Sequence, residues 1–286
     1  MTGDAVTRFS YFQWEDLHWK EKPYYLYIDC PKDKPLTNFK ACKGPEETVY
    51  NLRGMEDQFN LDDNGFTVKH QQFCLGVINE QTVTKEYLPS LETLISDTIG
   101  EDCEIIWFDW RSRSSDKAKT EFPTGTRIEL DDRTIDLAPA KTVHVDQTPR
   151  SAISRVNRHA GDRAQELLKG RVRIINIWRP CASVVESHPL ALLDGSTVPS
   201  EKLVEVDVVR PSYVGESYYP MEHNGYRWYF MDKQTKEEVL LFKMYDSNEA
   251  VKAKCCPHAS FTYDSLTENP RPRESIEARA LVFTRG

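Results

Sequence analysis

No stretch of this 286-residue sequence approaches the run of about eighteen apolar residues that a membrane-spanning helix requires. The polar N-terminus MTGDAVTRFS also lacks the apolar centre of a secretory signal peptide. A surplus of basic residues is missing too: the formal net charge of −8 at pH 7 argues against nucleic acid or an anionic membrane as the main partner. These absences predict a cytoplasmic protein that binds neither membranes nor nucleic acids.

The cysteines lack the regular spacing of a disulfide framework, and their number, seven, is odd. Free thiols in a reducing compartment are therefore the simpler interpretation. The sequence also contains no low-complexity tract, no internal repeat and no linker between two halves. A chain of this length can bury a proper core, so we predict a single domain over residues 1–286.

Two segments show the periodicity of helices. In KEYLPSLETLISDTIG, residues 85–100, apolar residues keep helical spacing up to a terminating glycine. In TPRSAISRVNRHAGDRAQELLKG, residues 148–170, a proline stands near the start and a glycine follows the end. Between alternating apolar positions further upstream, Asn64-Gly65 predicts a β-hairpin.

The remaining apolar segments are short and typical of strands. One, CEIIWFDW, precedes the second helix, and six follow it, at residues 171–180, 202–209, 226–232, 237–247, 251–263 and 275–283. Six strands separated by turn signals favour a barrel or jelly roll. We therefore predict a mainly β fold with flanking helices, a cupin-like double-stranded β-helix. Residues 1–140 would supply flanking strands and a helix, and residues 141–286 a metal-binding core.

The stretch KTVHVDQTPR, residues 141–150, places His144 and Asp146 two positions apart in a predicted extended segment. Side chains two residues apart in a strand emerge on the same face, so this imidazole and this carboxylate would point to one place. A solvated face is one explanation of the pattern. A metal site that awaits a third ligand is the other.

His258 is the candidate third ligand, because a jelly roll brings early and late strands together at its mouth. His144, Asp146 and His258 would then form a facial triad of two histidines and one carboxylate, which leaves three positions on Fe(II) open. A core or surface histidine is the alternative for His258. Cys255 and Cys256 suggest a rival zinc site, but neighbouring residues in a strand point to opposite faces.

The last predicted strand contains arginines that suit a carboxylate ligand. Arg273 and Arg279 are an even number of residues apart, and Arg279 interrupts an apolar strand. A buried guanidinium needs an anion, which could be the distal carboxylate of 2-oxoglutarate or an internal acidic residue. Spacing alone does not decide which arginine binds the cosubstrate.

Residues in two other strands complete the set of candidates. Asn176 and Trp178 share a face of their strand and Arg179 lies on the other, with Asn176 and Arg179 as candidates for cosubstrate binding. Trp178, Tyr226 and Trp228 are candidates for the substrate pocket, although a strand tryptophan is often plain core. The pocket predicted from them is aromatic, with few acidic or basic groups.

Five motifs carry a resemblance to a known family over nearly the whole chain. NLRGMEDQFNLDDNGF, HVDQTPRSAISRV, GRVRIINIWRP, EEVLLFKMYDS and PRESIEARALVF occur in the order found in the fungal hydroxylase/desaturase family of the asaB type. That family includes a gibberellin desaturase and relatives of a cephamycin methoxylation component. Arg273-Glu274-Ser275 also resembles the Arg-x-Ser element of many 2-oxoglutarate oxygenases.

The resemblance implies a non-haem oxygenase that uses Fe(II), 2-oxoglutarate and O2. Applied residue by residue, it supports His144, Asp146 and His258 as iron ligands and marks Arg273 and Arg279 as family positions. It implies hydroxylation, desaturation or oxidative cyclisation of a small specialised metabolite. The alternatives are a cupin-like iron dioxygenase that does not use 2-oxoglutarate, and a catalytically silent partner subunit. A homodimer or a heterodimer with a related subunit is compatible with these functions.

Overall fold

The strands at the centre of the fold are rich in apolar residues and also bury several charged ones, because both of their faces are covered. β8 (Arg171–Pro180), β13 (Glu238–Asp246) and β15 (Glu274–Thr284) bury almost every residue. They lie in a five-stranded antiparallel sheet of order β6-β13-β8-β15-β7, here called the major sheet. This computed structural model describes residues 3–28, 30–31, 35–72, 76–121, 132–181, 184–262 and 269–285.

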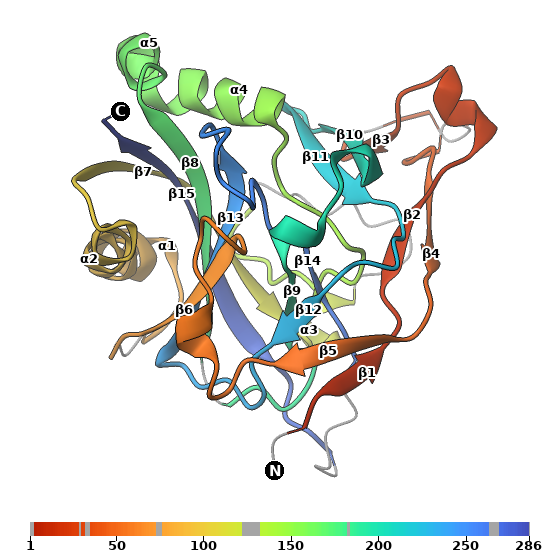
Figure 1. Ribbon diagram of the computed structural model, residues 1–286, viewed down its shortest axis with the longest axis horizontal. Coiled ribbons are helices and arrows are strands. Elements are labelled where there is room, and N and C mark those ends of the chain that lie inside the picture. The colour runs from red at the N-terminus through yellow and green to blue at the C-terminus, as the bar shows by residue number, and fades with distance from the viewer. Residues whose placement is uncertain are drawn as a thin grey trace.

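The outer face of the major sheet is covered by helix α2 (Leu88–Ile99), which lies beside the sheet in Figure 1. Leu91 and Ile95 of this helix join Ile175 and Ile177 of β8 in one apolar cluster. The helix ends at Gly100, whose φ of 73° is the left-handed conformation that glycine adopts without strain. The edge strands are β6 (Phe66–His70) and β7 (Cys103–Ser114), and α1 (Glu80–Thr82) and η3 (Val83–Tyr87) precede α2.

A second five-stranded sheet, of order β1-β5-β12-β9-β14, is here called the minor sheet. Side chains of the major sheet such as Trp178, Phe242 and Leu281 share an apolar cluster with Leu190 and Leu192 of β9, so this core lies between the two sheets. The strands are β1 (Ala5–Thr7), β5 (Glu47–Asn51), β12 (Trp228–Phe230), β9 (Leu190–Leu193) and β14 (His258–Ser260).

Smaller elements close the ends of the sandwich. Helix α4 (Pro149–Ala160) lies across one end in Figure 1 and adds Ala152 and Val156 to the core between the sheets. There are also two smaller sheets: a three-stranded one of order β11-β10-β3 and a two-stranded one of order β2-β4. Their bounds, with those of the remaining helices, are β2 (Ser10–Gln13), β3 (Tyr24–Leu26), β4 (Lys40–Lys43), β10 (Leu203–Val209), β11 (Val214–Pro220), η1 (Asp16–Trp19), η2 (Glu56–Gln58), α3 (Lys117–Thr120), η4 (Gly161–Arg163), α5 (Ala164–Leu167), η5 (Gly195–Thr197) and η6 (Ser200–Lys202).

The predicted mainly β fold with flanking helices is confirmed, but several elements differ from their predictions. The second helix breaks at Gly161, and the segment 251–263 forms a strand only over His258–Ser260; residue 263 lies outside the described residues. The hairpin at Asn64-Gly65 is wrong, because β5 pairs with β1 and β12 whereas β6 pairs with β13. Strands β9 and β11 were not predicted.

Both halves of the chain contribute to both sheets. Residues 1–140 supply β6 and β7 to the major sheet and β1 and β5 to the minor sheet. Residues 141–286 supply the other strands of both sheets.

Within the described part of the chain, no helix is long and apolar enough to cross a membrane.

Gly195 packs closely against Ala253 and Cys255, in the segment that leads to His258. This close packing predicts the effect of a larger side chain. A Cβ at position 195 would lie 2.1 Å from the carbonyl oxygen of Cys255 and 2.9 Å from the Cβ of Ala253. We expect Gly195→Ala to lower the free energy of unfolding by about 1–3 kcal/mol, because backbone must move. Urea denaturation measures the change. Gly3→Ala, where a Cβ meets nothing within 4 Å, is the control, and equal stabilities of the two variants would contradict the prediction.

Candidate metal centre

His144 and His258 are held opposite one another by the backbone. They form an isolated antiparallel bridge, with the amide of His144 donating to the carbonyl of His258 over 3.2 Å and the reverse bond at 3.0 Å. β14 fixes His258 in turn by pairing with β9. The imidazole rings lie with their centroids 4.4 Å apart. The segment 141–147 is thus bridged at single residues and is not a regular strand.

The hydrogen bonds of the two imidazoles leave the same ring nitrogen available on each. The Nδ1 atom of His144 lies 2.8 Å from the carbonyl oxygen of Thr142, and that of His258 lies 3.2 Å from the carbonyl oxygen of Cys256. A carbonyl oxygen only accepts, so each Nδ1 carries the proton and each Nε2 keeps a free lone pair. Both rings are therefore oriented as metal ligands usually are.

Asp146 completes a set of three donors. Its Oδ1 atom lies 3.6 Å from Nε2 of His144, and the ligand atoms of His144, Asp146 and His258 all lie within 4.8 Å of one another. No other group of three His, Cys, Asp or Glu side chains in the described ranges meets this condition. Two imidazole nitrogens and one carboxylate oxygen are the donor set of the facial triad that binds Fe(II). The residues present thus fit the predicted metal, and Cys255 and Cys256 do not join them.

The surroundings keep this carboxylate charged and one of the imidazoles neutral. Burial by itself raises the pKa of Asp146. Arg279 and the two histidines lower it by a larger amount, so the pKa of Asp146 lies well below its usual range. Burial lowers the pKa of His258 to about 3, and the neighbouring His144 acts in the same direction. A carboxylate anion and a neutral imidazole are the forms that bind metal ions.

Arg279 contacts three acidic side chains of the protein. Its Nε atom lies 3.0 Å from Oδ2 of Asp146, its Nη1 donates to Asp109 over 2.7 Å, and its Nη2 lies 2.5 Å from Glu277. Asn176 donates to the same Oδ2 of Asp146 over 2.8 Å. The alternative for Arg279, an internal salt bridge, is therefore the arrangement in the structure, and both residues orient the carboxylate of Asp146.

Arg273 lies in a small pocket with both histidines, and Glu277, the acidic side chain of that pocket, forms its ion pair with Arg279 instead. The Arg273 side chain is 3 % exposed, its Nη1 donates to the carbonyl of His188 over 2.7 Å, and the guanidinium stacks 5.5 Å from the centre of the Trp178 ring. It forms no ion pair within the described residues, and its Nε atom is buried without a hydrogen-bond partner there. Burial lowers the pKa of Arg273 to about 9.

Other predicted site residues divide between the site and positions away from it. Asn176 and Trp178 face the metal ligands, as their shared face predicted. Arg179 lies on the opposite face of β8, where it bonds Gln71 and the carbonyl of Lys236. The structure does not bring Tyr226 or Trp228 to the site either. They pack in a separate apolar cluster with residues of the minor sheet such as Val49 and Leu193.

A cavity of about 600 Å³ adjoins the triad and is lined by His144 and Asp146. Sequence reasoning missed most of its lining, including Asp109 and Arg111 of β7 and Arg155 of α4. The signal in β7 was present: Arg111 and Arg113 alternate in a strand that begins as an apolar run, as Arg279 does in β15. The predicted pocket with few acidic or basic groups is thus replaced by a strongly charged one.

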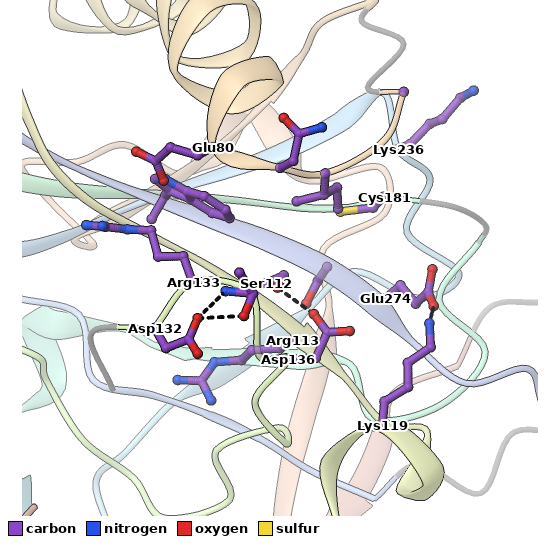
Figure 2. Close-up of a pocket in the computed structure, with 16 residues that line it drawn as sticks. Glu80, Ser112, Arg113, Lys119, Asp132, Arg133, Asp136, Cys181, Lys236 and Glu274 are labelled. Atoms are coloured by element: carbon purple, nitrogen blue, oxygen red, sulfur yellow. Dashed lines mark hydrogen bonds and ion pairs between the residues drawn. The ribbon is translucent and has the colours of Figure 1, made fainter. Parts of the chain in front are cut away.

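A second cavity, of about 840 Å³, lies on the other face of β7 and does not include the triad. Trp110 and Ser112 line it, whereas Asp109 and Arg111 line the first cavity, as alternation along a strand requires. Figure 2 shows its polar wall, where Ser112 donates to Asp136 over 2.5 Å and Lys119 pairs with Glu274. Of these two cavities, only the first is lined by members of the triad.

Two packed β-sheets with a two-histidine, one-carboxylate triad between them define the class of non-haem iron oxygenases with a double-stranded β-helix. Comparisons with known proteins give the family. Residues 9–283 match the family model described as "YDMC: Oxidoreductase/YMDC permease-like domain". The hydroxylase/desaturase efuI of Hormonema carpetanum is 33% identical over 254 residues, which is 82% of each chain.

Further relatives agree. The Fe(II)/2-oxoglutarate-dependent dioxygenase nvfI of Aspergillus novofumigatus is 30% identical over 275 residues, covering 92% of this chain and 91% of that one. A solved structure of the iron and alpha-ketoglutarate-dependent endoperoxidase NvfI matches 100% of both chains with a TM-score of 0.81 at 26% identity. The chain belongs to the fungal hydroxylase/desaturase family of Fe(II)/2-oxoglutarate-dependent dioxygenases. The predicted family, fold, enzyme class and cofactors are confirmed.

The contact between Asn176 and Asp146 predicts an effect on metal affinity. Because Asn176 orients the carboxylate, we expect Asn176→Ala to weaken Fe(II) binding by about 10- to 100-fold. Anaerobic titration with Fe(II) measures it. Ser217→Ala is the matched control, since Ser217 bonds only the main-chain carbonyl of Asp146, over 3.0 Å. Equal affinities of the two variants would show that the side-chain contact does not matter.

The lowered pKa of His258 predicts how stability depends on pH. Between its ordinary value of 6.5 and about 3, the unfolded chain binds a proton that the native state does not. The free energy of unfolding of the metal-free protein should therefore fall as pH decreases from 6.5 to 4.5, by about 1 kcal/mol per pH unit from this residue. Urea denaturation at several pH values should give a flatter profile for His258→Gln. Parallel profiles would contradict the assignment, because His159 and His188, whose pKa values are also lowered, remain in both proteins.

Proposed function

We propose that this enzyme oxidises a small specialised metabolite, with Fe(II) bound by His144, Asp146 and His258 and 2-oxoglutarate held by Arg273. The observation that carries the proposal is a buried guanidinium without an acidic partner among the described residues, in one pocket with both histidines. The substrate class is supported by relatives whose names place them in hydroxylation, desaturation and endoperoxidation, and in aspirochlorine biosynthesis.

Arg273 suits the distal carboxylate of 2-oxoglutarate better than Arg279 does. A buried guanidinium is costly unless an anion neutralises it. Arg279 is already neutralised by three carboxylates, whereas the bonds of Arg273 go to the carbonyl of His188 and, over 3.4 Å, to the hydroxyl of Ser260. A carboxylate at Arg273 would supply the missing charge and a partner for Nε, and Trp178 would form the wall beside it.

When bound, Fe(II) supplies the oxidation of an unactivated C–H bond by O2 at the expense of 2-oxoglutarate. The chain contributes binding and orientation. Asn176 and Arg279 hold the Asp146 carboxylate in place, and the two backbone carbonyls fix the imidazoles so that each Nε2 would be free to bind the ion. The buried Oδ1 of Asn176, which has no partner among the described residues, can accept a hydrogen bond from a water molecule or ligand beside the triad.

Two other functions make different predictions for one experiment. A cupin-like dioxygenase without 2-oxoglutarate would leave Arg273 without its anion, and a silent partner subunit would not need three oriented ligands. Succinate formation from 2-oxoglutarate, with candidate metabolites, histone-like peptides and alkylated oligonucleotides as substrates, separates the possibilities. Coupled turnover only with the peptides or oligonucleotides would contradict the metabolite proposal. Iron binding without any succinate formation would favour the alternative dioxygenase.

We also propose that the protein is cytoplasmic and works as one domain over residues 1–286. The free cysteines among the described residues support a reducing compartment. Strands from residues 1–140 and 141–286 lie in the same sheets, which supports one domain. A homodimer, or a heterodimer with a related subunit, remains a proposal that sedimentation of the purified protein tests.

The role of Arg273 gives a direct kinetic prediction. Arg273→Met should raise the KM for 2-oxoglutarate by tens-fold or more, because a buried bidentate contact with a carboxylate is lost. Arg271→Met is the matched control two residues away, since the exposed Arg271 pairs with Glu186 outside the pocket. Initial rates of succinate formation at varied 2-oxoglutarate measure both. An unchanged KM in Arg273→Met would remove this arginine from the cosubstrate site.

A further inference from the structure

The cavity beside the triad contains cationic side chains that the proposed function has not used. Arg111 and Arg113 come from β7 and Arg155 comes from α4, and all three line the same space as His144 and Asp146. In the described part of the chain none of the three forms an ion pair, in contrast to Arg279. The cavity of about 600 Å³ has the size of a small-molecule site.

Arg155 is held in a fixed orientation without an acidic partner among the described residues. Its guanidinium lies 4.4 Å from the centre of the Tyr213 ring and 5.2 Å from that of Phe108, and both rings line the cavity. Its Nε atom is buried and has no hydrogen-bond partner among the described residues. Stacking between aromatic rings restricts the planar group but supplies no counter-ion.

Arg111 and Arg113 are tethered in a similar way by backbone carbonyls. Nη1 of Arg111 donates to the carbonyl of Asp132 over 2.5 Å, and Nη1 of Arg113 donates to that of Ala138 over 2.7 Å. Arg111 is only 4 % exposed. A guanidinium has five N–H donors, so each bond leaves most of the donors of its side chain for another acceptor.

The acidic side chains that line the cavity already have cationic partners. Asp109 pairs with Arg279 and Arg133, and Asp146 pairs with Arg279. Glu216 pairs with Lys22 and Arg150 at the edge of the cavity. Burial lowers the pKa of Arg111 to about 10, and it lowers the pKa values of Arg113 and Arg155 as well, as expected for buried cations with too little negative charge nearby.

Aromatic side chains form another part of the cavity wall. Tyr25 and Tyr27 are stacked with centroids 4.7 Å apart, and Phe39 lies 5.1 Å from Tyr219. All four line the cavity. The lining thus offers flat apolar surfaces for the body of a ligand and unneutralised guanidinium groups for an anionic end.

We propose that the metabolite oxidised by this enzyme is a carboxylic acid with an unsaturated or aromatic body, whose carboxylate is bound by Arg111, Arg113 and Arg155. The inference rests on the proposed function, because it assigns the substrate class of the same site. One end of the substrate is then fixed by charge, and the length of its body selects the carbon that lies beside the metal ligands.

Binding of a matched pair of probes tests the proposal. The pair is 2-naphthoate and 2-naphthamide, which differ in charge and hardly in shape, and inorganic phosphate is the third probe. Titration calorimetry is done anaerobically on protein loaded with Fe(II) and 2-oxoglutarate, so that Arg273 is occupied, and repeated on unloaded protein. We expect naphthoate to bind at least about tenfold more tightly than the amide.

Substitutions locate the binding. Arg155→Met and Arg111→Met should each weaken naphthoate binding by at least about tenfold and leave naphthamide binding unchanged. Arg158→Met is the matched control: Arg158 lies one turn further along α4 and is exposed, and it stacks 5.2 Å from Tyr213 without lining the cavity. If Arg111→Met does not fold by circular dichroism, Arg155→Met, on the helix, decides.

Equal affinities for the acid and the amide would overturn the proposal, as would unchanged naphthoate binding in a folded Arg155→Met variant. Tighter binding of phosphate than of naphthoate would overturn the assignment to a carboxylate. Failure of the proposed function looks different. In that case the protein does not bind Fe(II) and 2-oxoglutarate, while Arg155-dependent binding of naphthoate persists in the unloaded protein.

Discussion

The buried ion pair between Arg279 and Asp146 is the contact on which the site depends. Arg279 stands in the last strand of the major sheet and contacts Asp109 on the neighbouring strand, Glu277 on its own strand and Asp146 on the segment between the sheets. A buried charge that loses its partner costs about 3–5 kcal/mol, so these segments cannot separate easily. The same charge keeps Asp146 ionised, and an ionised carboxylate is what a metal ligand must be.

Arginines near the triad fall into two kinds that have different uses. Arg279 is neutralised by acidic side chains of the protein, and it orients the carboxylate of Asp146. Arg273 and the cavity arginines Arg111 and Arg155 are held by carbonyl oxygens or aromatic rings, which orient a guanidinium without cancelling its charge. In a low-dielectric site such groups attract anions. Our two proposals use this difference: the cosubstrate binds at Arg273 in the small pocket, and an acidic metabolite binds at the arginines of the larger cavity.

Much of the fold could be predicted because buried strands and helices have a recognisable pattern of apolar residues in the sequence. The apolar run at residues 171–180 became β8 with the same bounds, and the helical spacing after residue 85 became α2. β9 was missed because LALL is only four residues long and fits a strand or a helix equally. The Asn64-Gly65 hairpin failed for another reason: the turn forms at Gly65, with φ of 85°, but the strands on its two sides belong to different sheets.

The sequence by itself determined the donor atoms of the candidate metal centre, because residue type sets the ligand chemistry and a spacing of two put His144 and Asp146 side by side. It also determined that arginines would be buried near them. Which arginine forms ion pairs with the protein, and which has none among the described residues, was decided only by the tertiary structure. The reason is physical: the charge state of a buried site depends on distances of a few ångströms between residues as far apart in the chain as Asp109, Asp146 and Arg279, and only the packed sheets set those distances.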